Sequence, residues 1–143
     1  LARECGLDFV GLTVSGLPRS LSPRLLTWPG EMFGAIYKAR QILQKFRPTV
    51  VLGTGGYASA PPLAAANSLG IPTVVHEPDA HPGLVNRLMG QKAELISLGM
   101  QGAAGRMHSK SGRLAFNGNP VRMSFLGERK RDAGCAVLGL RTN

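Results

Sequence analysis

Three glycines within four positions, Gly53, Gly55 and Gly56, form the first group of residues with recognisable chemistry. They follow a short β-branched, apolar run at 49–52 and precede a helix-forming segment. Glycine lets the backbone take conformations closed to other residues, so that its N–H groups can come close to a ligand. Such N–H groups at the start of a helix bind phosphate. The loop is therefore predicted to bind a phosphate or diphosphate.

Two side chains suited to proton transfer, His76 and Glu77, follow a second apolar run at 71–75, and Asp79 comes next. Open α/β sheets bind ligands at the carboxyl ends of their strands. The glycine amides and these acid/base side chains are therefore expected to share one crevice, with a general base in it. A histidine at a strand end is also a common structural residue, and the adjacent Glu77 is what favours a catalytic role for His76.

The segment 49–79 carries the signals of a strand, loop, helix and strand unit. Ser59 is expected to cap the helix, Pro61 and Pro62 to lie in its first turn, and Gly70 to end it. Both strands are apolar on both faces, which is typical of central strands. Strands separated by helices pair in parallel through right-handed crossovers, so the predicted fold class is α/β with a Rossmann-like parallel sheet.

Further elements are predicted on either side of this unit. They are a strand at 8–14, a short turn at 23–27, a helix capped by Thr27 with Pro29 in its first turn and ending near Phe46, a helix at 82–90, strands at 93–98 and 114–116, and a glycine-rich loop at 99–112. Three- and four-residue spacing predicts a buried stripe on the long helix, made of Met32, Phe33, Ile36, Tyr37, Leu43 and Phe46.

Length and composition limit the class of protein. With 143 residues, 43% of them hydrophobic, the chain is expected to form one domain. Cys5 and Cys135 lie far apart without metal-ligand spacing, which predicts reduced thiols, a cytoplasmic compartment and no metal site. No run approaches the ~20 apolar residues of a membrane span, and no export signal begins the chain, so a spanning or secreted protein is not expected.

The formal net charge of +9 calls for an anionic partner: nucleic acid, a membrane surface or a phosphorylated substrate. Nucleic acid is disfavoured because aromatic residues are few and no nucleic-acid-binding motif is present. No Lys or Arg occurs between Thr49 and Asn86, so the basic charge flanks the glycine loop. A surface or a large anionic ligand fits better, although Lys38, Arg40 and Lys45 could also form an ordinary solvated helix face.

The glycine loop has two other readings. The run from Gly53 to Ala58 satisfies the dinucleotide fingerprint G-x-G-x-x-A, and Glu77 stands where a ribose-binding acid belongs. This would make the chain a domain of an NAD(P)-dependent oxidoreductase. That fingerprint usually opens its domain, however, whereas a strand and a helix are expected before it here. A purely structural glycine turn is the other alternative.

Three segments in combination carry a resemblance: VVLGTGGYASAPP, LGIPTVVHEPDAHPGLVNRL and NGNPVR. In this order and spacing they resemble the MurG family, the UDP-N-acetylglucosamine:lipid I N-acetylglucosaminyltransferases of peptidoglycan synthesis. The resemblance covers roughly residues 8–122. It implies a GT-B enzyme of two Rossmann-like domains, with an inverting mechanism that uses neither metal nor cofactor. The muramoyl 4-hydroxyl of lipid I attacks C1 of the donor sugar, UDP leaves, and lipid II forms.

The resemblance also implies roles for the residues of the crevice. Gly55, Gly56 and Tyr57 match a glycine loop thought to hold the acceptor diphosphate with backbone amides. His76 and Glu77 match positions implicated in activity, with Glu77 as proton acceptor or orienter.

Donor-side residues follow from the same resemblance. Asn86 matches an asparagine of the cleft, and Arg122 matches an arginine at the domain junction that touches the donor nucleotide. Asp79 stands where the family has an asparagine that contacts the donor sugar, so its negative charge is a departure that would work against UDP.

The domain expectations also come from the resemblance. Residues 1–122 would be a partial N-terminal, acceptor-binding domain, and 123–143 a linker cut before the donor-binding domain. The family's first glycine loop would precede this chain. The partners implied are UDP-N-acetylglucosamine, lipid I and an anionic membrane surface, at the cytoplasmic face of the bacterial plasma membrane. Attachment is expected around Leu21, Leu25, Leu26 and Trp28. A non-catalytic membrane-surface module is the alternative.

Overall fold

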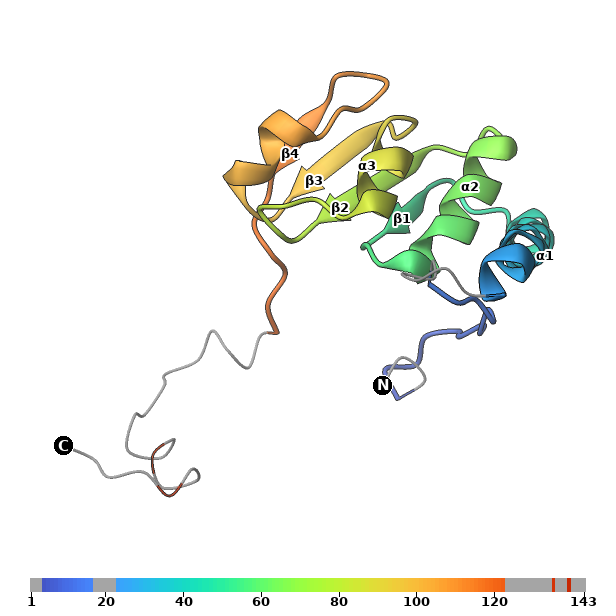
Figure 1. The fold of residues 1–143 in the computed structure, drawn as a ribbon. Coiled ribbons are helices and arrows are strands. Elements are labelled where there is room, and N and C mark those ends of the chain that lie inside the picture. The colour runs from blue at the N-terminus through green and yellow to red at the C-terminus, as the bar shows by residue number, and fades with distance from the viewer. Residues whose placement is uncertain (1–3, 17–22, 123–134, 136–138, 140–143) are drawn as a thin grey trace.

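A computed structural model describes residues 4–16, 23–122, 135 and 139. Its centre is a sheet of four parallel strands in the order β1-β2-β3-β4 (Figure 1). The strands are β1 (Val51–Gly53), β2 (Thr73–Glu77), β3 (Leu95–Leu98) and β4 (Leu114–Phe116). The α/β class with a Rossmann-like parallel sheet is thereby confirmed.

Helices α2 (Ala60–Ser68) and α3 (Leu84–Gly90) pack against strands β1 and β2 of this sheet. The other described helices are α1 (Arg24–Phe46) and the 3₁₀ turns η1 (Tyr57–Ser59) and η2 (Gln101–Arg106). The helix α2 packs on β1, α3 packs on β2, and the two helices touch each other (Figure 1). The long helix α1 packs mainly against α2.

The alternation of side chains along β2 decides which residues reach the core. Thr73, Val75 and Glu77 are buried, whereas the residues between them are only partly buried. Val75 packs with Leu63 of α2 and Ile96 of β3 in the main hydrophobic cluster. Because successive side chains of a strand point to opposite faces, Glu77 lies on the face of Val75 and His76 on the other.

Gly53 allows α2 to approach β1 closely. A Cβ atom built on this glycine would overlap the side chain of Leu63. At the other end of α2, Gly70 has φ +70° directly after the C-cap Leu69, so the predicted glycine stop is confirmed. Pro61 and Pro62 lie in the first turn of α2, as predicted, and Pro61 is buried.

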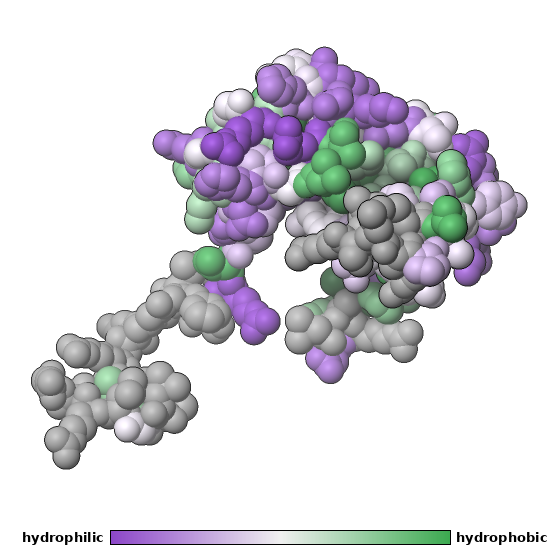
Figure 2. Space-filling model, viewed as in Figure 1, coloured by the Kyte–Doolittle hydropathy of each residue, from purple (hydrophilic) through white to green (hydrophobic). Residues whose placement is uncertain are grey.

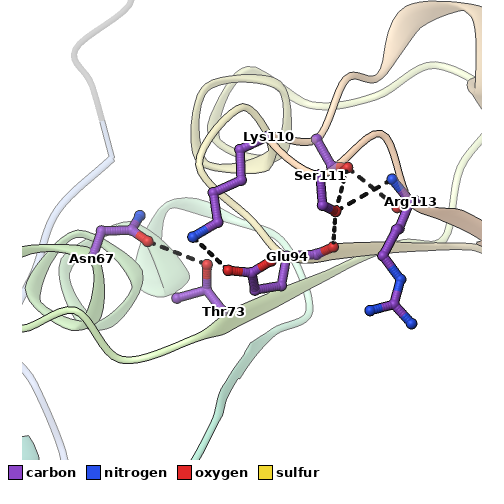
Figure 3. A network of polar contacts seen from close by, with 7 residues as sticks. Asn67, Thr73, Glu94, Lys110, Ser111 and Arg113 are labelled. Atoms are coloured by element: carbon purple, nitrogen blue, oxygen red, sulfur yellow. Dashed lines mark hydrogen bonds and ion pairs between the residues drawn. The ribbon is translucent and has the colours of Figure 1, made fainter.

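Polar contacts connect residues at the amino ends of strands β2, β3 and β4 (Figure 3). The Thr73 hydroxyl donates to Asn67 Oδ1 at 3.2 Å, and Lys110 pairs with Glu94 at 2.5 Å. The Ser111 hydroxyl donates to the backbone carbonyl of Glu94. These contacts hold the loop before β4 against β3, at the edge opposite the carboxyl ends of the strands.

Several predicted elements differ from the structure. Residues 8–14 form no strand, because no strand among the described residues lies beside them to complete a hydrogen-bonded ladder. Consequently β1 lies at an edge of the described sheet, and only β2 of the two predicted central strands is central. The expected loop 99–112 contains η2, whose Ala103 is buried, and Met107 just after it is buried too.

The long helix begins earlier and turns a different face inward than predicted. Its N-cap is Pro23, so Thr27 and Pro29 lie inside it. The buried residues are Ala35, Ala39 and Leu43, whereas Phe33 and Tyr37 are 73% and 63% exposed. The predicted stripe is confirmed at Leu43, which is buried, and at Ile36, which packs against the core. It is wrong at Phe33, Tyr37 and Phe46, which are exposed, because the packing against α2 uses small residues.

The chain after Arg122 lies almost wholly outside the described residues. The predicted linker at 123–143 therefore lies almost wholly outside the described residues. The predicted anchor residue Leu21 is also outside them, and the side chain of Leu25 is not described. No helix in the described ranges is long and apolar enough to cross a membrane.

Candidate functional site

The glycine loop turns sharply between β1 and η1. Gly55 and Gly56 have φ values of +96° and +71°, a region that residues with a side chain rarely adopt. Within the described part of the chain, no hydrogen bond engages the N–H groups of Gly55, Gly56 and Tyr57. These amides lie beside the start of α2, where the helix dipole favours an anion.

Ser59 is the N-cap residue of α2, as its position predicted, but its hydroxyl caps no helix N–H. Instead its Oγ donates to the carbonyl oxygen of Gly56 at 2.8 Å. A second bond to the same oxygen comes from the Ser59 N–H at 3.3 Å. The two bonds fix the peptide after Gly56 and so hold the loop in its turn.

A hollow of about 680 Å³ opens between this loop, the end of β2 and the start of α3. The predicted site residues that line it are Gly55, Gly56, Tyr57, Glu77, Asp79 and Asn86. Among the residues that the structure describes, no lysine or arginine lines it. Within this part of the chain, attraction for an anion in the hollow would come from backbone N–H groups.

Glu77 is the most constrained polar residue of the hollow, with 2% of its surface exposed. Its Oε1 accepts from the N–H of Asp79 at 3.0 Å. Its Oε2 accepts from the N–H of Gly83 at 3.2 Å and from Asn86 Nδ2 at 2.9 Å. Both carboxylate oxygens are thus engaged, and Glu77 holds the turn 79–83 and the first turn of α3 in place. This geometry suits an orienting residue better than a proton acceptor.

Asn86 connects α3 to the end of β2. Its Nδ2 donates to the carbonyl of His76 at 3.1 Å as well as to Glu77, while its buried Oδ1 has no partner among the described residues. A Cβ atom on Gly55 would come within 3.2 Å of this same Nδ2. The side-chain amide of Asn86 therefore leaves little room for a side chain at position 55.

His76 lies outside the hollow. Because it points to the opposite face of β2 from Glu77, its Nδ1 lies 3.1 Å from Ser97 Oγ on β3, and Asn117 Nδ2 donates to that hydroxyl at 3.0 Å. Its Nε2 is buried without a partner among the described residues. The expected single crevice thus contains Glu77 but not His76, since neighbours along a strand cannot share a face.

Arg122 is exposed and also lines no part of the hollow. The segment that leads to it is nevertheless fixed beside the site: Asn119 Nδ2 donates to the carbonyl of Pro78 at 3.1 Å. A Cβ atom on Gly99 would overlap Asn119, so this glycine makes the approach possible.

Residues that the sequence interpretation missed hold the site together. Gly83 supplies an N–H to Glu77, and Ser97 and Asn117 surround His76. A polar Ser97 inside the apolar run 95–98 was the available signal for the second group. In the described ranges no group of three or more His, Cys, Asp or Glu could hold a metal ion.

A glycine loop between a parallel strand and a helix, with a carboxylate at the end of the next strand, is the arrangement of a Rossmann-like domain, a fold that binds ligands at the carboxyl edge of its sheet. The chain belongs to the family described as the glycosyltransferase family 28 N-terminal domain, whose sequence model matches residues 1–97. This match gives no support to the oxidoreductase alternative.

Individual relatives point the same way. The chain is 37% identical over all its 143 residues to a Desulfitobacterium hafniense protein, and 40% identical over 139 residues to one from Halothermothrix orenii. Both are named UDP-N-acetylglucosamine–N-acetylmuramyl-(pentapeptide) pyrophosphoryl-undecaprenol N-acetylglucosamine transferase. The chain spans 38% and 37% of their lengths.

The fold has a counterpart among solved structures. The crystal structure of MurG from Acinetobacter baumannii superposes with a TM-score of 0.65 at 19% identity, over 91% of this chain and 37% of that one. The likeness supports the fold alone.

Proposed function

We propose that this chain supplies the acceptor-binding part of an enzyme that transfers N-acetylglucosamine from UDP-N-acetylglucosamine to lipid I. The 4-hydroxyl group of the muramoyl sugar gives up its proton to water or to the departing UDP, and its oxygen forms the new bond to C1 of the donor sugar. The bond from C1 to the UDP oxygen breaks, UDP leaves, and the configuration at C1 inverts. The product is lipid II, the precursor used in peptidoglycan synthesis. Names of relatives at 37–40% identity support this assignment.

The observation that carries the proposal is the loop of unengaged amides at Gly55, Gly56 and Tyr57, facing a hollow whose opposite wall is Glu77. A diphosphate needs several N–H donors that are already oriented, because oriented dipoles cost no reorganisation when the ligand arrives. Two positive φ values provide that orientation here. The diphosphate of lipid I is the anion that we assign to the loop.

Glu77 is proposed to act by holding neighbouring groups in place and not by accepting a proton. Its three hydrogen bonds fix the turn 79–83 and Asn86, and that turn forms the wall opposite the glycine loop. The unpartnered Oδ1 of Asn86 would accept from a sugar hydroxyl once the amide shifts slightly. His76, from the other face of β2, would influence the site only through its bond network with Ser97.

The donor is proposed to bind mainly outside the described residues. Arg122 and Asp79 are exposed, and both would face UDP-N-acetylglucosamine from the domain that is expected to follow. Residues 1–122 would form the acceptor-binding domain and 123–143 the connection to the donor-binding domain. No metal or cofactor is needed in this scheme.

We also propose that the protein binds peripherally to the cytoplasmic face of the plasma membrane. The long helix α1 exposes Leu26, Phe33 and Tyr37, with Lys38 also exposed on it. Each basic side chain near an anionic surface contributes roughly 1 kcal/mol, which salt screens. Co-sedimentation with anionic vesicles, weaker at high salt and absent with neutral vesicles, is expected; equal binding to both kinds would count against this anchor.

The function is tested by titrating the chain with a short-chain lipid I analogue and, separately, with NADH. The analogue is expected to bind and NADH is not. Gly56→Ala should weaken binding of the analogue, because Gly56 has φ +71° with open space around it, so that the strain falls on the loop alone. Gly105→Ala, also in open space but without a positive φ, is the matched control. Saturable NADH binding without a response to the analogue would reverse the assignment.

Vesicle binding gives a further discrimination. If the chain were only a membrane-surface module, its vesicle binding would be the same in the wild type, in Gly56→Ala and in Glu77→Ala. The proposed function predicts instead that vesicles carrying the lipid I analogue retain the wild type more strongly than Gly56→Ala.

A further inference from the structure

We propose that an apolar groove between α1, α2 and α3 binds the first isoprenoid units of the acceptor's polyprenyl chain. The inference rests on the proposed function and deepens it, because it assigns part of the hydrocarbon tail to the protein and not to the bilayer. The names of the relatives describe an acceptor with a pyrophosphoryl-undecaprenol group, so a hydrocarbon chain begins directly at the diphosphate.

The groove has a volume of about 240 Å³ and is almost entirely apolar. Trp28 and Met32 line it from α1, Ala64 from α2 and Leu88 from α3, and none of the described residues that line it is charged. The indole N–H of Trp28 already donates to the carbonyl of Ser15 at 3.2 Å, so its ring can offer the groove an apolar surface. Concave apolar sites of this kind are typical of ligand-binding sites.

The groove continues the glycine-loop hollow. Tyr57, Leu84 and Val85 line both of them. A diphosphate held by the amides of Gly55 and Gly56 would therefore have its first ester carbon beside the ring of Tyr57, at the entrance of the groove. The diphosphate of the acceptor requires N–H donors, which the glycine loop offers. Its hydrocarbon chain requires apolar walls, which the adjoining groove offers.

The groove is separate from the proposed membrane-facing residues of α1. Phe33 and Tyr37 each follow a groove residue, Met32 and Ile36, by one position, which places them about 100° further round the helix. On α3 the groove opens to the surface, because its lining residues Leu84 and Leu88 are 59% and 49% exposed. Figure 2 shows hydrophobic surface over this part of the molecule. The tail can leave the groove along α3 toward the bilayer.

The test uses Trp28, the single tryptophan of the chain, as a reporter inside the groove. The chain is titrated with inorganic diphosphate and with dimethylallyl, geranyl and farnesyl diphosphate, all below micelle-forming concentrations. Affinity is expected to rise with each isoprenoid unit, by at least about tenfold from inorganic to farnesyl diphosphate, because each unit buries more hydrocarbon. The Trp28 emission should shift to the blue in parallel.

Two variants localise the effect. Ala64→Phe fills the groove and should abolish the gain with chain length while leaving the affinity for inorganic diphosphate unchanged. Leu88→Asp, at a half-exposed position that does not support the core, should do the same if Ala64→Phe fails to fold. Phe33→Ala, at an exposed position of α1 that does not line the groove, is the matched control and should retain the whole gain.

The outcomes separate the two proposals. Diphosphate binding that is indifferent to chain length overturns the groove assignment and leaves the proposed function in place. Farnesol binding as tightly as farnesyl diphosphate overturns it as well, because the groove would then act without the glycine loop. Failure of a short-chain lipid I analogue to bind under any condition overturns the proposed function itself.

Discussion

At the scale of single residues, the site depends on one buried carboxylate. Glu77 accepts hydrogen bonds from Asp79, Gly83 and Asn86, and so joins a strand end, a turn and a helix start. A general base must be able to reach the proton that it removes. A carboxylate whose two oxygens are engaged inside the protein is better placed to fix the shape of the hollow.

Glu77→Gln is expected to lower the free energy of unfolding by about 2 kcal/mol, because hydrogen bonds to a charged group contribute about 1.5–3 kcal/mol and the new amide must point one donor at another. Urea denaturation measures the change. Asp79→Asn, at an exposed position, is the control and should stay within about 0.5 kcal/mol of the wild type, since the contact that Asp79 makes with the described residues is through its backbone N–H. Equal effects of the two substitutions would contradict the positioning role.

Gly55 is the second residue on which the site depends. Gly55→Ala is expected to destabilise the fold by about 1–2 kcal/mol, because φ is +96° and the added methyl group would crowd Asn86. Gly105→Ala is expected to be close to neutral in the same denaturation measurement. A neutral Gly55→Ala would mean that the loop relaxes freely and is not pre-oriented for an anion.

At the scale of elements, the fold could be predicted where local signals and tertiary packing agree. Pro61, Pro62 and Gly70 mark the ends of α2, and the apolar runs mark β2 and β3, because these features act within a few residues. His76 and Glu77 proved to lie inside β2, not beyond it, since the strand runs two residues further than its apolar run.

Other elements could not be predicted because their outcome depends on distant partners. The apolar run 8–14 has no neighbouring strand among the described residues, so its composition alone does not make a ladder. The face of α1 is chosen by Ala65 and Ala66 of α2, against which Ala39 fits closely. Counting large side chains therefore selected Phe33 and Tyr37 wrongly.

For the site, sequence reasoning found most residues of the hollow but not the separation of His76 from Glu77. The strand boundaries decide which neighbour faces inward, and boundaries are the weakest part of a sequence interpretation. Gly83 was missed because its contribution is a backbone N–H, which leaves no chemical signature in its side chain.

The contact between α2 and β1 offers a test at this scale. Gly53→Ala is expected to cost about 1–3 kcal/mol, because its methyl group overlaps Leu63. Leu63→Ala alone should cost about 2–5 kcal/mol by leaving a cavity. The double variant should cost less than the sum of the two, since the new methyl group enters the space that leucine left. Additive costs in denaturation curves would contradict the close packing.

At the scale of the whole molecule, catalysis is expected to need more than these residues. Transfer requires the acceptor oxygen and the donor carbon to be held within attack distance, with dipoles directed at the departing UDP. The described residues offer a glycine loop that we propose binds the acceptor and a carboxylate, Glu77, that we propose orients it, whereas the chain spans only 38% of the Desulfitobacterium relative. We therefore expect binding of a lipid I analogue by the 143 residues without turnover.

The most direct measurement is UDP release by a chimera in which residues 8–122 replace the matching part of the Desulfitobacterium relative. With both UDP-N-acetylglucosamine and a short-chain lipid I analogue, steady UDP release is predicted. Glu77→Ala should reduce kcat about 100-fold, as a small misplacement of the acceptor does. A folded chimera that binds both substrates but releases no UDP would contradict the account.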